Sequence, residues 1–186
     1  MGSLSEVQQS IILGSLLGDG YMRCKANAHL QVTHSIAQKS YVDWKYKNLS
    51  EYILTPPKSY KGNSKRIGYR FFTRSLPEFT CFYKRFYVDG VKIIPSELKL
   101  TPLALAVWFM DDGSRSGNSC YLNTQGFLLQ DQLKLIDFLS KYFGLKPNCN
   151  RDKIYYRLRF SVEDSKKLTE LIEPYVLPFL RYKLLI

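Results

Sequence analysis

Two apolar runs that each end abruptly in Asp-Gly constrain this chain more than any other feature. The first is ILGSLLGDG at residues 12–20, and the second is LAVWFMDDG at residues 105–113. If the first run is helical, Gly14 and Gly18 lie four residues apart on one face of the helix. Each interior glycine costs about 1 kcal/mol relative to alanine in a helix, so we expect another backbone to approach that face closely.

The closing Asp-Gly pairs indicate the chemistry. The terminal glycine is predicted to end each helix in a left-handed conformation, which leaves the preceding aspartate at the carboxyl end of the helix. A carboxylate is disfavoured there, because the helix dipole favours cations at that end. We therefore interpret Asp19 and Asp112 as ligands of a shared cation. The alternative for either Asp-Gly pair, taken alone, is an ordinary turn.

The two runs together resemble the motifs of the LAGLIDADG homing endonucleases, in particular the branch whose second motif reads like the WFMDDG of residues 108–113. The resemblance covers nearly the whole chain and implies a single-chain member with two motifs. It also implies that the two motif helices pack side by side. The last aspartate of each motif, Asp19 and Asp112, then points into one active site.

Composition is compatible with a nucleic-acid partner. The 186 residues fit one domain or two small halves, and a hydrophobic content of 45% is enough for a core. A formal net charge of +11 suits a polyanion, the alternative being a basic protein without such a partner. No apolar run is long enough to cross a bilayer, and no signal-peptide pattern is recognised. The 4 cysteines lack metal-binding spacing, so we expect reduced thiols and no zinc site.

Hydrophobic periodicity predicts the same order of elements after each motif. Helices are expected at residues 7–17, 36–54, 76–87, 128–143 and 162–172, with the second motif helix starting near Thr101; strands are expected at residues 21–25, 30–34, 69–74, 119–124 and 154–160. Residues 58–66 are interpreted as a basic, turn-rich connection.

These elements predict an α+β protein with two copies of helix-strand-strand-helix-strand-strand-helix, at residues 1–95 and 96–186. By the resemblance, the two pseudo-symmetric αββαββα halves form a saddle of antiparallel sheets around the packed motif helices, and this saddle sits on the DNA major groove.

The paired acids favour a magnesium site. Mg²⁺ prefers oxygen ligands and typically takes one or two carboxylates together with phosphate oxygens and water, which Asp19 and Asp112 suit. Such an ion activates water and stabilises charge during phosphodiester hydrolysis. The resemblance adds the backbone carbonyls of Gly18 and Asp111 as further metal ligands, with Mn²⁺ as a possible substitute. Asp111 is bulkier than its counterpart Gly18, so an asymmetric helix interface is expected.

The resemblance also implies one polar residue from each half that orders the attacking water. The matching positions, each just after a threonine at a strand end, are His34 and Gln125. His34 has the chemistry to accept a proton, donate to phosphate or bond a water, and its alternative is a surface histidine. Gln125 cannot act as an acid or base, so it is assigned to water positioning.

Exposed strand faces are expected to read DNA, because Arg can recognise guanine and Asn or Gln can recognise adenine. Lysines in the basic connection suit phosphate contacts, which add affinity without specificity. The candidate DNA-binding residues are Arg23, Lys25, Gln31, Lys39, Lys61, Lys65, Arg66, Arg70, Arg115, Asn123, Arg151, Arg157 and Arg159. Each of them alone has the alternative of a solvated charge.

The leading hypothesis is a monomeric, Mg²⁺-dependent, sequence-specific endonuclease that cuts both strands of DNA at a long site, with the intron or intein mobility that the resemblance implies. Three alternatives stay open: an RNA maturase that assists intron splicing and binds intron RNA, a non-catalytic DNA-binding regulator on the same fold, and a single-strand nickase. No membrane association is expected. The expected location is intracellular, in a chloroplast or mitochondrion or in a bacterial or archaeal cytoplasm.

Overall fold

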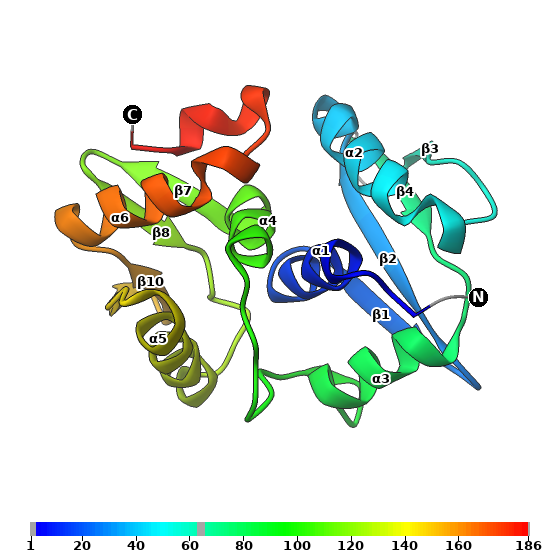
Figure 1. Cartoon of the computed structure of the whole chain (residues 1–186), viewed down its shortest axis with the longest axis horizontal. Helices are drawn as coiled ribbons and strands as arrows, with labels where there is room; N and C mark the ends of the chain where they lie inside the picture. The colour runs from blue at the N-terminus through cyan, green and yellow to red at the C-terminus, as the bar shows by residue number, and fades with distance from the viewer. Residues whose placement is uncertain (1–2, 63–65, 186) are drawn as a thin grey trace. The chain divides into compact units, whose positions relative to one another are not determined.

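The seven-element repeat expected from the sequence occurs twice in the structure. The computed structural model describes residues 3–62 and 66–185. The chain divides into two units, residues 1–85 and 86–186, somewhat earlier than the division expected from the sequence. Each unit contains one four-stranded antiparallel sheet and its own helices (Figure 1). The predicted α+β class is therefore confirmed.

The first unit consists of a four-stranded sheet with helices before, between and after its strands. Its elements are α1 (Glu6–Leu17), β1 (Tyr21–Cys24), β2 (Ala28–Ser35), α2 (Lys39–Leu49), β3 (Lys58–Lys61), β4 (Ile67–Phe72) and α3 (Pro77–Phe86), with short 3-10 helices η1 (Ile36–Gln38) and η2 (Ser50–Tyr52) flanking α2. The strands are antiparallel in the order β1-β2-β4-β3. Side chains alternate along β2, so that Leu30, Val32 and His34 lie on its buried face.

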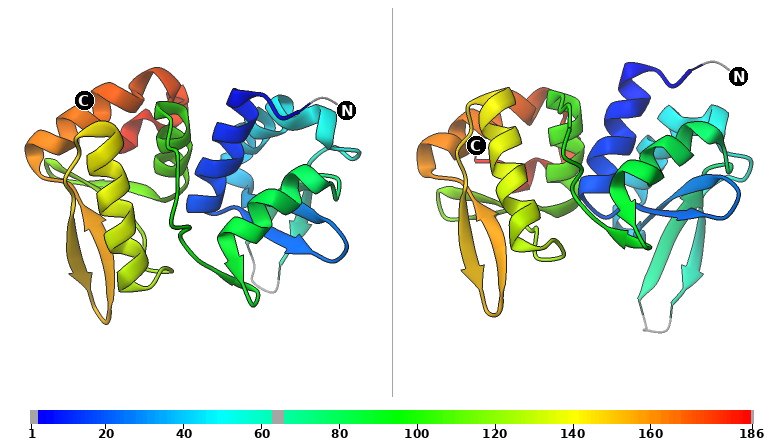
Figure 2. Two further views of the ribbon diagram at one scale, coloured as in Figure 1. Left: turned by 60° about the horizontal axis from the view of Figure 1, so that its bottom comes forward. Right: turned by 90° about the horizontal axis from the view of Figure 1, so that it is seen from below.

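The second unit repeats this order. Its elements are α4 (Pro102–Asp112), β7 (Gly113–Ser116), β8 (Ser119–Leu122), α5 (Leu129–Phe143), β9 (Asn148–Asp152), β10 (Tyr155–Arg159), α6 (Val162–Ile172), η3 (Glu173–Tyr175) and η4 (Pro178–Lys183). The sheet order is β7-β8-β10-β9, and Figure 2 shows α5 beside the hairpin of β9 and β10. Before α4, the short strands β5 (Tyr87–Val88) and β6 (Val91–Lys92) form a hairpin around Asp89-Gly90, as the turn signal predicts.

The helix starts follow the capping signals in the sequence. Ser5 and Gln8 form a capping box at α1, in which the Gln8 Oε1 accepts from the Ser5 N–H at 2.9 Å. Thr101 caps α4 and accepts from the N–H of Ala104 at 3.0 Å. At the carboxyl end of α5, Gly144 stops the helix in a left-handed conformation with a φ of 65°.

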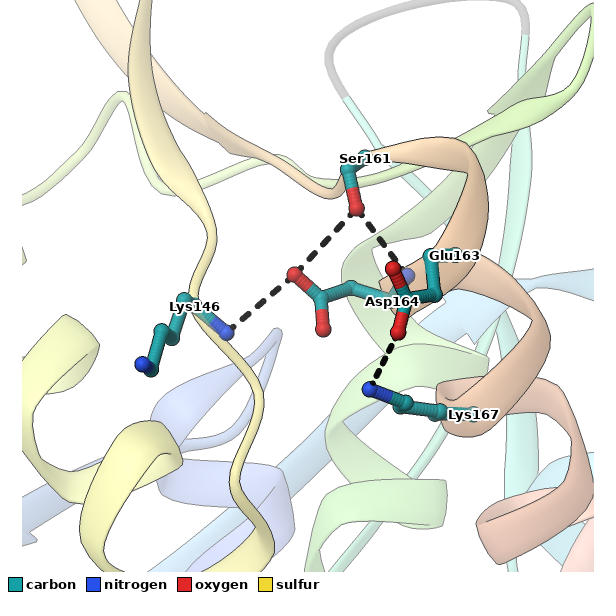
Figure 3. Close-up of polar contacts among 5 residues, drawn as sticks. All are labelled: Lys146, Ser161, Glu163, Asp164 and Lys167. Atoms are coloured by element: carbon teal, nitrogen blue, oxygen red, sulfur yellow. Dashed lines mark hydrogen bonds and ion pairs between the residues drawn. The ribbon is translucent and has the colours of Figure 1, made fainter.

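The start of α6 combines a cap with a hydrogen bond to the loop between α5 and β9 (Figure 3). The Ser161 hydroxyl accepts from the N–H of Asp164 at 3.0 Å, and the Asp164 carboxylate accepts from the backbone N–H of Lys146 at 3.4 Å. Glu163 pairs with Lys167 one turn later at 2.7 Å. Acidic residues in the first turn also complement the helix dipole.

The left-handed ends predicted for the two motif helices are wrong. The closing glycines are Gly20 and Gly113; neither is among the glycines with a positive φ, and Gly113 caps α4 in an extended conformation at φ −74°. The glycines are needed for space instead. A Cβ on Gly20 would lie 2.6 Å from the Ser15 carbonyl oxygen, and one on Gly113 would collide with the carbonyl oxygen of Phe109. Each glycine therefore lets the chain leave its helix and enter a strand directly against the last helical turn.

Two further expectations about local structure need correction. Gly18 follows α1 rather than lying within it, so only Gly14 of the predicted pair is helical. Residues 58–61 of the expected connection form the strand β3, which pairs with β4 from Lys58↔Arg70 to Lys61↔Ile67. The sequence of this edge strand, KSYK, has no apolar alternation because the strand is mostly exposed, so periodicity could not reveal it.

Within residues 3–62 and 66–185, no helix is both long and apolar enough to cross a bilayer. The four cysteines, Cys24, Cys81, Cys120 and Cys149, are free thiols. Burial raises the pKa of the Cys120 and Cys149 thiols above the usual value, which disfavours the reactive thiolate at neutral pH.

Candidate active site

Asp19 lies in the turn between α1 and β1. The N–H of Gly18 donates to the Gly14 carbonyl at 3.1 Å, and the N–H of Gly20 donates to the Ser15 carbonyl at 2.6 Å. These two bonds fix the backbone on either side of Asp19. The Asp19 side chain is 48% exposed, so its carboxylate is held at a defined place yet open to a ligand.

His34 is a polar neighbour of that carboxylate. Its Nδ1 lies 3.5 Å from the Asp19 Oδ2, while only 3% of its side chain is exposed. The ring packs on Tyr41 of α2 with centroids 5.1 Å apart. The alternation along β2 places His34 on the inner face, so it is not the surface histidine that the sequence left open.

A pocket of about 400 Å³ brings these groups together with residues from one end of the β2–β4 ladder, where β2 ends and β4 begins. Its lining includes Asp19, His34, Gln38 and Arg66. The pocket therefore combines an acid, an imidazole, an amide and a guanidinium, which suits a phosphate-containing ligand. Arg66 was predicted from sequence as a DNA-binding residue, and the fold places it in the lining of the same pocket as Asp19.

Asp112 occupies a different local setting in the second unit. It is the last residue of α4, and its carbonyl oxygen accepts from the N–H of Asn123 at 3.0 Å and from the Asn123 Nδ2 at 2.7 Å. Asp112 and Asp111 are both partly exposed. Asp19 and Asp112 lie in different units, so the cation site shared between them stays a prediction.

Sequence reasoning missed Lys183 in η4. Its Nζ donates to the carbonyl of Met110 at 2.6 Å and to that of Asp111 at 3.3 Å. A cation at this place offsets the negative end of the α4 dipole and supplies positive charge next to Asp112. The Asp111 carbonyl, predicted as a metal ligand, thus already accepts from Lys183. Helix carboxyl ends generally favour a nearby cation, so a lysine or arginine could have been expected there. The sequence does not indicate that Lys183 fills this place, because it lies about 70 residues after the end of α4 in the chain.

A second pocket, of about 300 Å³, lies beside this end of α4. It is lined by Gly113, Ser114, Arg115, Tyr182 and Lys183. One Arg115 nitrogen donates to the backbone carbonyl of Leu184 at 2.9 Å, which leaves its other donors for a ligand.

Gln125 is placed differently from His34. After β8 the chain turns, with the N–H of Thr124 donating to the Leu122 carbonyl at 3.0 Å, so Gln125 lies beyond the strand. Its amide donates to the Asp152 carboxylate at 2.9 Å. Within the contacts described for the second unit, Gln125 is therefore anchored to β9, and its water-positioning role stays a prediction.

Several predicted DNA-binding arginines are held by aromatic rings. The Arg70 guanidinium lies 4.1 Å from the Tyr60 ring centroid and 5.1 Å from that of Phe72. The Arg157 guanidinium lies 4.4 Å from the Tyr121 ring centroid. Stacking fixes the plane of a guanidinium and leaves its edge for hydrogen bonding.

The other predicted DNA-binding residues are more dispersed. Arg23, Lys25 and Gln31 line one pocket of about 560 Å³, and Lys61 is exposed on β3. Three others bind protein groups: Lys39 pairs with Asp43, Arg151 donates to the Lys153 carbonyl at 2.9 Å, and Arg159 donates to Ser119 at 3.3 Å. Lys65 lies outside the described residues. The hydrogen bond to Asp43 raises the pKa of Lys39, so this lysine stays charged. Burial, with the nearby Arg23 charge, lowers the pKa of His29 on the same sheet.

The carboxylate oxygens of Asp19 and Asp112 are of the ligand type that Mg²⁺ prefers. Among the described residues, no cluster of three or more His, Cys, Asp or Glu side chains could hold a metal alone. Mg²⁺ does not require one, because it is commonly held by one or two carboxylates and completed by phosphate oxygens and water. The half-exposed Asp19 carboxylate beside a pocket meets that requirement for oxygen donors.

Comparisons with known proteins agree on one family. The sequence profile of the LAGLIDADG DNA endonuclease family matches residues 9–168. A probable intron-encoded endonuclease 1 of Wickerhamomyces canadensis is 32% identical, and the match covers 98% of this chain and 86% of the relative. The cytochrome b mRNA maturase bI2 of Debaryomyces hansenii is 27% identical, covering 97% of this chain and 74% of the maturase.

The RecA protein of Mycobacterium gastri is 34% identical over 98% of this chain, but the chain spans only 48% of that protein's length. Among solved structures, the homing endonuclease I-WcaI bound to its DNA recognition sequence has a TM-score of 0.93 at 28% identity. That match covers 100% of this chain and 89% of the I-WcaI chain.

Proposed function

Since this chain belongs to the LAGLIDADG DNA endonuclease family, we propose that it is a sequence-specific endonuclease that cuts both strands of double-stranded DNA. The observation that carries the proposal is the setting of Asp19, whose half-exposed carboxylate borders a pocket with His34 and Arg66. The similarity to I-WcaI, which is bound to its DNA recognition sequence, supports DNA as the substrate. One chain supplies both units, so we propose that it acts as a monomer.

We further propose that the enzyme depends on Mg²⁺, with Mn²⁺ as a substitute, held by Asp19 and Asp112. When bound, the ion would supply an activated water and stabilise the charge of the transition state. His34 is buried against Tyr41 and directed at Asp19, so it is suited to orient the attacking water or to move its proton. Arg66 and Lys183 bring positive charge to the phosphate from the first and second unit respectively.

Cleavage of a randomised double-stranded DNA library tests this function. The wild-type chain is incubated with Mg²⁺ or with Ca²⁺, beside an Asp19→Asn, Asp112→Asn double variant. Enrichment of one long sequence, cut on both strands only by wild type with Mg²⁺ and still bound by the variant, is the expected result. Binding without cutting would instead support a regulator, and cutting of a single strand would support a nickase.

An RNA maturase is the second candidate, because a relative named as a cytochrome b mRNA maturase matches nearly the whole chain. Splicing of an intron RNA by wild type and by the double variant separates the two functions. A maturase should promote splicing without either carboxylate, whereas the endonuclease needs both for cutting. Since DNA or intron RNA is the substrate in either case, an intracellular location in an organelle or a prokaryotic cell stays part of the proposal.

A further inference from the structure

We infer that Asn123, which the sequence suggested as a DNA reader, is a positioning residue for Asp112 and links it to Arg157. This inference rests on the proposed function, because it assigns Asn123 a role within the cleavage site. Three observations carry it: the hydrogen bonds that Asn123 makes, the contacts that hold Arg157 in place, and the different residue at the matching position of the first unit.

The donors of Asn123 are directed at the end of α4. Its backbone N–H and its Nδ2 both donate to the Asp112 carbonyl oxygen, at 3.0 and 2.7 Å. The same Nδ2 lies 3.3 Å from the Ser114 Oγ. The last carbonyls of a helix have no partner within the helix, so two donors on one of them fix where the helix ends. The Asp112 backbone, and with it the base of the carboxylate side chain, is thereby held in place.

The acceptor of Asn123 is also used. Its Oδ1 accepts from the Arg157 Nη1 at 3.3 Å. To read adenine, an asparagine must offer both its donor and its acceptor to the base. Asn123 would have to give up these bonds to do so, which argues against base recognition.

Arg157 is itself held from two sides. Its guanidinium stacks over the Tyr121 ring at 4.4 Å and donates to Asn123, while its Nε is covered and has no acceptor among the described residues. A run of contacts thus leads from β10 through the end of β8 to the end of α4. If Arg157 contacts DNA, its placement and that of Asp112 depend on the same asparagine amide.

The first unit supports its acid in another way. The β1–β2 register pairs Tyr21 with Gln31, and the β7–β8 register pairs Gly113 with Leu122. Continuing each ladder places Thr33 opposite Asp19 and Asn123 opposite Asp112. Thr33 has no amide, and its hydroxyl accepts from the Gln31 side chain at 3.1 Å. The Asp19 carboxylate is approached by His34, and the residue matching Asn123 in the first unit carries no amide.

Replacing Asn123 with threonine, the residue at the matching position of the first unit, tests the inference. Asn123→Thr keeps the backbone N–H but removes the amide, and Ser116→Ala serves as the control because this serine is exposed on the same strand, β7, and lines none of the pockets described above. The target is the DNA selected from the library with wild type. Three quantities are measured: the single-turnover cleavage rate constant of each strand, DNA affinity in Ca²⁺, and amide hydrogen exchange of peptides spanning residues 106–113.

We expect Asn123→Thr to lower the cleavage rate constant by roughly 10- to 100-fold, as loss of a support behind a ligand does. DNA affinity should fall only as far as Arg157 contributes to it, so the cleavage rate constant is measured on fully bound DNA. Exchange at the end of α4 should become faster. Ser116→Ala should leave all three quantities near wild type. Asn123→Leu, which has a similar size and removes the amide without adding charge, gives the same test if the threonine variant is unstable.

Two results would overturn the inference. One is weaker or less selective DNA binding by Asn123→Thr with a wild-type cleavage rate of the bound DNA, which would make Asn123 a reader. The other is no change in rate or in exchange. If wild type itself cuts no sequence, the proposed function fails instead, and the exchange measurement still decides whether Asn123 holds the end of α4.

Discussion

His34 illustrates how one residue depends on strand alternation. His34 lies on the same face of β2 as Leu30 and Val32, so its ring is buried. The chain turn between α1 and β1 brings the Asp19 Oδ2 to 3.5 Å from the His34 Nδ1. We predict that His34→Gln, which keeps a hydrogen-bonding amide but cannot carry a proton, slows single-turnover cleavage by about 100-fold. DNA affinity in Ca²⁺ should not change. Wild-type cleavage by His34→Gln would mean that the imidazole only orients a group, as an amide can.

Lys183 is a single residue whose positive charge acts on the end of α4. Its bonds to the Met110 and Asp111 carbonyls place an ammonium group at the negative end of the α4 dipole. Lys183→Met should therefore lower the free energy of unfolding by about 1 kcal/mol and slow cleavage, whereas Lys183→Arg should retain most of both. Urea denaturation and single-turnover cleavage measure the two effects. Equal losses in the methionine and arginine variants would argue against a role for the charge.

At the scale of elements, the turn from motif helix to first strand is the feature most sensitive to size. Gly20→Ala would place a methyl group 2.6 Å from the Ser15 carbonyl oxygen, so we expect a loss of about 1–3 kcal/mol in unfolding free energy. Gly126→Ala is the matched control, because a Cβ there meets nothing within 4 Å. Thermal and urea unfolding should separate the two variants. A Gly20→Ala variant as stable as the Gly126→Ala variant would contradict the steric argument.

Element order was largely predictable because periodicity and caps are local signals. Ser5 and Thr101 begin their helices where the capping rules place them, and Gly144 ends α5. The edge strand β3 lacked apolar alternation because few of its side chains are buried. The glycine conformations at Gly20 and Gly113 were mispredicted because Asp-Gly also occurs where a close approach, and not a positive φ, requires glycine.

The site was less predictable than the fold for a physical reason. Asp19, Asp112 and His34 were predicted as site residues because motifs or strand ends mark them, and their roles stay predictions. The partners of Asp112 come from distant parts of the second unit, namely Asn123 after β8 and Lys183 in η4. Hydrogen bonds formed by long-range contacts leave no local pattern, so sequence reasoning assigned Asn123 to DNA and did not consider Lys183.

For the whole molecule, the net charge of +11 predicts strongly salt-dependent DNA binding. Within that total, two positions of the first sheet should behave differently. Lys61 is exposed on the edge strand β3 and suits a phosphate, while Arg70 is stacked by Tyr60 and Phe72 with its edge free to read a base. Lys61→Ala should therefore weaken binding equally for all sequences and reduce the slope of log affinity against log salt by about 0.9.

Arg70→Ala should weaken binding to the selected target far more than to random DNA, since a bidentate base contact contributes about 1–3 kcal/mol of discrimination. Titrations of both DNAs at several salt concentrations distinguish the two variants. If Arg70→Ala instead lowers affinity for both DNAs by the same factor, its guanidinium contacts a phosphate. The aromatic stack would then serve to hold the charge against the backbone, and base recognition by this unit would have to come from the pocket lined by Arg23 and Gln31.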